Sequence, residues 1–137
     1  MIVTDRGFTE DTWTAGFVPL AELAANDAAP GIGVDIPSDA DPASLAGRLL
    51  SVALIRVDFP SFADGRGYTI ARELRRHGFP GRLRAKGHVI ADQYAMARRS
   101  GFDEVEIADD LARRQPEAHW LARAEWRAHD YQSRLRA

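Results

Sequence analysis

The feature that most constrains this chain is an alternation of apolar and charged residues in its strand-like segments. In residues 51–59, which are rich in β-branched side chains, Arg56 and Asp58 alternate with apolar residues. Successive side chains of a β-strand point to opposite faces, so one face of this strand is apolar and the other is charged. Residues 82–87 and 104–108 follow the same pattern. Each predicted strand therefore has one face to bury under helices and one polar face.

Helical segments are expected between these strands. Residues 68–77 and 89–100 have apolar side chains at three- and four-residue spacing, and a Gly-Phe pair follows each as a C-terminal cap. Strands that alternate with ten-residue helices are typical of parallel βαβ units, whose crossovers place the helices on one face. We expect an α/β fold of repeating βα units with a mostly parallel sheet and helices mainly on one face. This would be a two-layer sheet or a partial βα-barrel.

The length of 137 residues predicts a single α/β domain over residues 1–137. Residues 1–30 show no clear pattern, and a short strand is expected at 33–36. Asp41 is expected to cap a short helix that continues through Leu50.

The C-terminal residues carry a seam of apolar side chains near heptad spacing, formed by Trp120, Ala124, Ala128, Tyr131 and Leu135. This seam predicts one long helix over residues 116–136. The helix would pack back on the domain, form a dimer or grip a partner. Trp126 lies off the seam and would be a contact residue if exposed.

The composition argues against several classes of protein. The chain has no cysteine, which excludes disulfides, thiolate metal sites and a cysteine nucleophile, and fits a reducing cytoplasm. The first six residues contain no long apolar run, so we expect neither a signal peptide nor a membrane span. The histidines lack the spacing of metal ligands, and no flavin or nicotinamide fingerprint is present, so neither a metal nor a cofactor is expected.

The charge is distributed unevenly along the chain. Residues 1–64 hold ten acidic residues and three arginines, a net charge of −7, whereas residues 65–137 have a net charge of +5. The basic residues are interleaved with acidic ones, which argues against nucleic-acid binding.

The segment 59–69 joins a predicted strand to a predicted helix, at the carboxyl end of the strand where α/β proteins bind ligands. In one interpretation its glycines let the backbone approach an anion, and Arg66 adds positive charge. In the other, Asp64 caps the helix and the glycines only make the turn. We favour the second, because a carboxylate and an anionic ligand would compete for the same donors.

Polar residues also occupy the next strand-to-helix junction, at the same end of the sheet. His88 beside Asp92 and Gln93 suits acid–base chemistry, although such residues more often cap a helix or pack a loop. On the charged face, Arg84 either pairs with neighbouring carboxylates in solvent or takes part in binding a ligand or partner. No catalytic residue is assigned. The ligand-binding candidates are Asp64, Gly65, Arg66, Gly67, Tyr68, Arg84, His88, Asp92 and Gln93.

Three blocks of the sequence resemble a known family. They are the run Phe59-Pro60-x-Phe62-x-Asp64-Gly65-Arg66-Gly67-Tyr68-Thr69-x-Ala71 with Leu74-Arg75, the run Leu83-Arg84-Ala85-x-Gly87-x-Val89 with Asp92-Gln93 and Gly101-Phe102-Asp103, and the terminal Tyr131-Gln132. Over about residues 33–132 the chain resembles the family catalogued as domain of unknown function 934. Thr69 keeps the hydroxyl of the serine that is more frequent there.

The resemblance implies a role in sulfur assimilation. Members are typically bacterial and are commonly encoded beside the assimilatory sulfite reductase haemoprotein, and some are labelled oxidoreductases for that reason. It therefore implies a cytoplasmic accessory or partner protein of sulfite reduction, which binds through the polar strand-end cluster. Two alternatives stay open. One is a small enzyme or anion-binding module that uses Asp64, Arg66, Arg84, His88 and Asp92, and the other is a structural homodimer.

Overall fold

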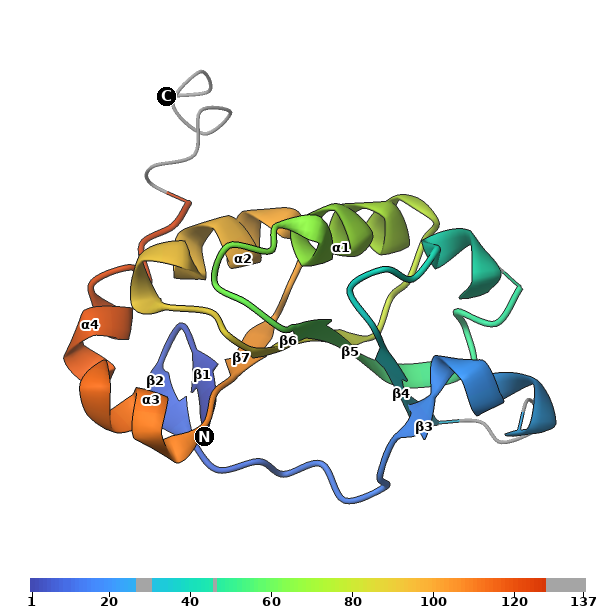
Figure 1. The fold of residues 1–137 in the computed structure, drawn as a ribbon, viewed down its shortest axis with the longest axis horizontal. Coiled ribbons are helices and arrows are strands. Elements are labelled where there is room, and N and C mark those ends of the chain that lie inside the picture. The colour runs from blue at the N-terminus through green and yellow to red at the C-terminus, as the bar shows by residue number, and fades with distance from the viewer. Residues whose placement is uncertain (27–30, 46, 128–137) are drawn as a thin grey trace.

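The computed structural model describes residues 1–26, 31–45 and 47–127. Within them, seven strands form one sheet in the order β2-β1-β7-β6-β5-β4-β3 (Figure 1). The strands are β1 (Ile2–Thr4), β2 (Gly7–Thr9), β3 (Val18–Pro19), β4 (Ile32–Ile36), β5 (Val52–Phe59), β6 (Arg82–Gly87) and β7 (Glu104–Glu106).

Five of the strands, β3 to β7, pair in parallel and in their order along the chain. The helices α1 (Arg66–Arg76) and α2 (Tyr94–Ser100) both lie on one face of the sheet (Figure 1). A short 3-10 helix, η3 (Ala91–Gln93), leads into α2. The predicted α/β fold, with a mostly parallel sheet and helices mainly on one face, is confirmed. The consecutive strand order differs from that of a doubly wound sheet, whose order reverses, and it fits both a two-layer sheet and a partial βα-barrel.

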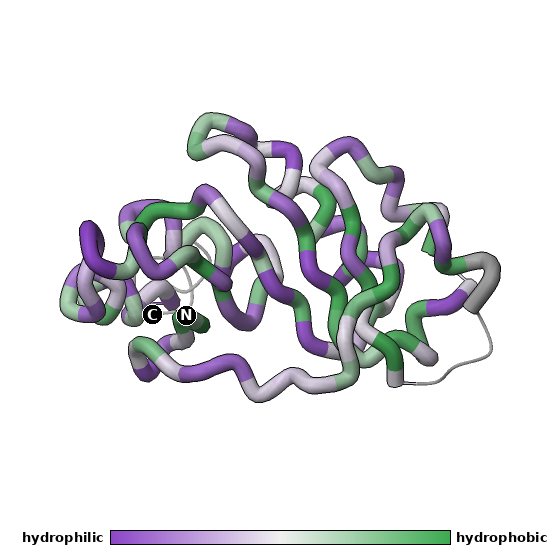
Figure 2. The backbone as a smooth tube through the Cα atoms, turned by 60° about the horizontal axis from the view of Figure 1, so that its bottom comes forward, coloured by the Kyte–Doolittle hydropathy of each residue, from purple (hydrophilic) through white to green (hydrophobic). Residues whose placement is uncertain are grey.

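The apolar sides of the strands form the core beneath these helices. Ile55, Val57 and Ala85 of the central strands have no exposed surface, and Leu74 of α1 and Ala97 of α2 are equally buried. Hydrophilic and hydrophobic residues alternate along the central strands in Figure 2, which brings the opposite face forward. The period-two pattern of the sequence thus decides which side of the sheet α1 and α2 cover.

The N-terminal residues, for which no clear pattern predicts a structure, extend the sheet. The strands β1 and β2 form an antiparallel hairpin that pairs with β7. Residues 10–17 then run from this hairpin across the face that α1 and α2 leave uncovered, and enter β3 (Figure 1). We call residues 10–17 the crossing segment. The 3-10 helix η1 (Leu20–Asn26) follows β3.

The predicted helix from Asp41 to Leu50 is shorter than expected. Asp41 accepts a hydrogen bond from the backbone N–H of Ala43, as a cap should. The 3-10 helix η2 (Pro42–Leu45) nevertheless ends early, and turns replace it from Gly47 to Leu50. Glycine in this stretch weakens helix formation.

The predicted long helix over 116–136 is wrong for the described residues. The chain forms α3 (Asp109–Arg114) and α4 (Glu117–Leu121), and turns follow. Trp120 is buried against Tyr94, and Trp126 also packs on the domain, where its indole N–H donates to Asp5. Residues six apart lie about 120° apart around a continuous helix, so one helix would not turn both rings inward. The seam residues Ala128, Tyr131 and Leu135 lie outside the described residues.

Candidate functional site

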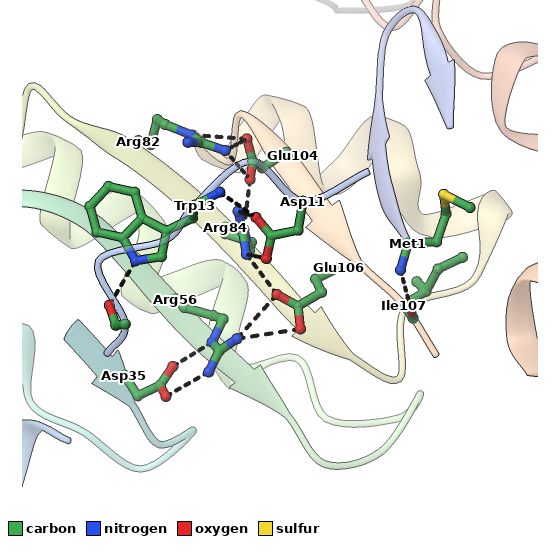
Figure 3. A network of polar contacts seen from close by, with 11 residues as sticks. Met1, Asp11, Trp13, Asp35, Arg56, Arg82, Arg84, Glu104, Glu106 and Ile107 are labelled. Carbon is green, nitrogen blue, oxygen red and sulfur yellow. Dashed lines mark hydrogen bonds and ion pairs between the residues drawn. The ribbon is translucent and has the colours of Figure 1, made fainter. Parts of the chain in front are cut away.

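Charged side chains on the face opposite α1 and α2 form one ion-pair network (Figure 3). At its centre, Arg84 donates from Nε to Glu104 at 2.6 Å and from Nη1 to Glu106 at 2.7 Å. Arg56 links the same Glu106 to Asp35, whose oxygens accept from its Nε and Nη2 at 2.6 and 2.8 Å. The strand register places Arg56 directly opposite Arg84, and the shared Glu106 compensates for these like charges.

The crossing segment covers the middle of this network. Asp11 accepts hydrogen bonds from both terminal nitrogens of Arg84 at 3.0 Å. The centroid of the Phe17 ring lies 3.6 Å from the guanidinium carbon of Arg56. Arg84 has no exposed surface as a result. The prediction that Arg84 pairs with neighbouring carboxylates is confirmed, but the expected bare, solvated face is wrong at this position. The physical reason is that the crossing segment brings both a carboxylate and an aromatic ring onto it.

The pKa values in this network follow from the pairing. Burial of Arg84 favours its neutral form, but the hydrogen bonds with Asp11 and the charge of Glu104 outweigh burial and raise its pKa. The hydrogen bonds from Arg84 lower the pKa of Asp11 in turn. A ligand would reach Arg84 only by displacing Asp11. In this structure Arg84 links the crossing segment to β7 through its ion pairs with Asp11, Glu104 and Glu106.

At the carboxyl end of β5, Asp64 and Arg66 bind each other. The Arg66 guanidinium donates to Asp64 at 2.7 Å, and the backbone N–H of Arg66 donates to Asp64 at 3.1 Å. Asp64 thus binds the first amide of α1, but Gly65 and not Asp64 occupies the N-cap position. These hydrogen bonds lower the pKa of Asp64 to about 2. Arg66 also donates to Ser38, in the loop after β4. An anion at this loop would compete with Asp64 for every one of these donors.

The other residues of this loop have packing roles. A Cβ on Gly67 would lie far inside van der Waals contact with three ring carbons of Phe59, so this glycine lets α1 approach β5. It lies inside α1 rather than in the turn before it. The side chain of Tyr68 is buried, with its ring centroid 5.0 Å from that of Phe59, and burial raises its pKa. Gly65 precedes α1 with an ordinary φ of −89°.

The candidates at the next junction join the two loops at the carboxyl edge. The His88 ring meets the exposed ring of Phe62 edge-on at 5.0 Å, and Gln93 donates to the Phe62 carbonyl at 2.9 Å. Asp92 pairs with Arg123 at 2.7 Å. We call the exposed side chains of Phe62, Arg66, His88 and Asp92 the strand-end rim. Asp64, Arg66, His88, Asp92 and Gln93 thus lie at one end of the sheet, while Arg84 lies apart on its face.

A pocket that the sequence did not indicate lies on the polar face, beyond the crossing segment. It has a volume of about 540 Å³ and lies toward the carboxyl ends of β4, β5 and β6. None of the ligand-binding candidates lines it. We call it the face pocket; its lining residues are Pro19, Leu20, Ala21, Asp35, Ile36, Pro37, Arg56, Asp58 and Lys86.

Two charged groups of the face pocket stand out. Lys86 and Asp58 are neighbours in the strand register, and both are exposed. Neither side chain has a hydrogen bond or ion pair among the residues that the structure describes. Lys86 is also the only lysine in the whole sequence. The presence of a single lysine is the one feature of the sequence that distinguishes position 86.

Neither a metal cluster nor a membrane-spanning helix is found in the described part of the chain. No group of three or more His, Asp or Glu side chains in it is placed to hold a metal ion. Within the same residues, every helix is too short or too polar to cross a lipid bilayer.

Comparison with known proteins places the sequence in a family. The family model described as "Bacterial protein of unknown function (DUF934)" matches residues 33–137. The chain belongs to the DUF934 family. No similar curated protein and no similar solved structure was found. The DUF934 match begins inside β4, so the strand-end rim lies within it, and the hairpin and crossing segment lie before it.

Proposed function

We propose that this DUF934 protein is an accessory protein of assimilatory sulfite reduction that binds the sulfite reductase haemoprotein through its strand-end rim. The resemblance supports the pathway, because members of the family are commonly encoded beside that haemoprotein. The absence of cysteine is in keeping with the cytoplasm, where this pathway would place the protein.

The observation that carries the choice of surface is the exposed ring of Phe62. The side chain is 40% exposed, yet the residue is held at two points, by the His88 ring and by the hydrogen bond from Gln93. A fixed, partly exposed aromatic ring among charged groups is typical of a binding hot spot, because little conformational entropy is lost on association.

The polar groups of the rim favour binding over catalysis. Arg66 pairs with Asp64, and Asp92 pairs with Arg123. Exposed ion pairs of this kind contribute little to folding, so they remain available to exchange partners at an interface. The rim therefore combines an apolar anchor with charges that can steer a partner.

The test is association between the purified chain and purified sulfite reductase haemoprotein, measured by biolayer interferometry and size-exclusion chromatography with light scattering. We expect a complex at micromolar concentration, and at least about tenfold weaker binding for Phe62→Ala and Arg66→Glu. Leu50→Ala is the matched control, because Leu50 is 90% exposed and precedes β5, at the opposite end of the sheet.

Thermal unfolding of each variant shows whether the fold is intact. No complex between the wild-type chain and the haemoprotein at micromolar concentration would overturn the proposal. A loss of binding that is equal in the Leu50 and Phe62 variants would exclude the rim as the contact surface.

A further inference from the structure

The face pocket contains a balanced set of charges. Its lining has two acids, Asp35 and Asp58, and two bases, Arg56 and Lys86. Asp35 and Arg56 already satisfy each other through two hydrogen bonds. Asp58 and Lys86 lie side by side on adjacent strands, and neither side chain has a partner within residues 1–26, 31–45 and 47–127. A ligand that matches them carries both an anionic group and a positively charged donor.

The rest of the lining is apolar. One wall is formed by Pro19 at the end of β3 with Leu20 and Ala21 of η1. Another is formed by Ile36 at the end of β4 and by Pro37, which follows it. Pockets of this kind, mostly apolar with a few converging polar groups, take small organic molecules, and the volume of about 540 Å³ is within their usual range. The ligand therefore has an apolar body beside its two charges.

We propose that the face pocket binds a free α-amino acid with an apolar side chain. Its carboxylate would pair with Lys86, its ammonium group would pair with Asp58, and its side chain would lie against Leu20 and Pro37. A bare inorganic anion fits less well, because its attraction to Lys86 is offset by repulsion from Asp58 and because it would leave the apolar walls exposed to water.

The identity of the base supports this assignment. The chain uses arginine at every other basic position, and lysine only at position 86. A lysine ammonium is a compact point charge with three donors, whereas guanidinium is a planar fork that would fill more of a small pocket. Asp58 also cannot be drawn into the neighbouring network, because Arg56 is engaged by Asp35 and Glu106.

The test uses the full chain and isothermal titration calorimetry with L-leucine and L-methionine. We expect saturable binding at ligand concentrations up to about 1 mM. The analogues that lack one charge, 4-methylpentanoate and isoamylamine, should bind at least about tenfold more weakly, as should inorganic sulfate. Binding of sulfate as tight as that of leucine would replace the proposal with an anion site.

The single lysine gives a direct structural readout. Reductive methylation with ¹³C-formaldehyde labels Lys86 and the N-terminal amine, whose NMR signals are distinguishable. Leucine should shift the Lys86 signal and leave the N-terminal signal unchanged. A saturable calorimetric signal with no change at Lys86 would mean that the amino acid binds elsewhere.

Variants complete the test. Lys86→Gln and Asp58→Asn should each weaken leucine binding at least about tenfold. Arg99→Gln and Asp109→Asn are the matched controls, because they remove exposed charges from α2 and α3 and should bind leucine normally. Absence of binding by the wild-type chain overturns the proposal. That result leaves the haemoprotein complex untouched, because the complex is measured without amino acids and through different residues.

Discussion

Arg84 is a cation without exposed surface, and three carboxylates, those of Asp11, Glu104 and Glu106, share its charge. The free energy lost by taking such a group out of water is recovered only while every partner stays in place. Gly67 is constrained just as tightly by sterics, since its α-carbon lies against the ring of Phe59. Both residues come from blocks that the sequence singled out as candidate ligand sites, and both have structural roles here.

Replacing the buried cation should destabilise the protein strongly. Arg84→Met keeps most of the side-chain volume but leaves Glu104, whose side chain is 8% exposed, without its closest counter-charge. We expect a loss of about 3–5 kcal/mol in the free energy of unfolding, measured with urea. Arg66→Met, which breaks an exposed pair, should lose far less. Equal losses in the two variants would contradict the role given to burial.

Gly67→Ala should destabilise the protein although alanine favours helices. The added methyl group must displace the ring of Phe59, which also packs on Phe102. Overpacking of this kind costs about 1–3 kcal/mol, more than the gain of about 1 kcal/mol in helix propensity. Gly47→Ala is the control, because a Cβ there meets nothing within 4 Å. A higher melting temperature for Gly67→Ala than for the wild type would refute this packing argument.

Among the elements, the crossing segment has the largest effect on the polar face of the sheet. It has no regular structure before β3, and its position depends on side-chain contacts such as Asp11 with Arg84 and Phe17 with Arg56. Periodicity in the sequence cannot predict such contacts, because residues 11 and 84 are 73 positions apart. The segment buries the centre of the network and leaves the face pocket open beyond it.

Removing the carboxylate of Asp11 should increase local opening of the crossing segment and leave the rest of the fold unchanged. In Asp11→Ala we expect faster amide hydrogen exchange across residues 10–17, because the segment loses its two hydrogen bonds to Arg84. Exchange in α1 should change little. Glu10→Ala removes a carboxylate from the same segment without touching Arg84 and should leave exchange unchanged. Unaltered exchange in Asp11→Ala would show that Phe17 and Trp13 hold the segment alone.

At the scale of the whole molecule, ion pairs connect the ends of the chain to its middle. Asp5, in the hairpin turn, accepts hydrogen bonds from Tyr94 and Arg98 on α2 and from Trp126 near the C-terminus. Burial opposes ionisation of Asp5, but these hydrogen bonds outweigh it and lower its pKa. Asp11 acts in the same way on the opposite face, where Arg84 lowers its pKa.

These two carboxylates predict how stability depends on pH. Because their pKa values are lower in the folded chain, the unfolded chain takes up protons first as the pH falls below about 4. Their contribution is therefore fully present above that pH and is lost as the pH drops through the folded pKa values. Urea midpoints between pH 7 and pH 3 should show the loss, and Asp5→Asn should flatten it. A pH dependence in Asp5→Asn that is as steep as that of the wild type would contradict the role given to Asp5.

Sequence patterns alone predict the parallel strand–helix units, the polar and apolar sides of β5, β6 and β7, and the end of the sheet at which the candidate loops lie. These features follow from local rules, since side-chain alternation and helix caps depend on residues a few positions apart. Long-range packing sets the burial of Arg84, the close contact of Gly67 with Phe59, the end of α4 at Leu121, and the position of Lys86 and Asp58 side by side in a pocket. Each of these features depends on contacts between side chains that are far apart in the sequence. Hydrophobic and charge periodicity does not predict such contacts, because it reports only the spacing of residues that are close in the sequence.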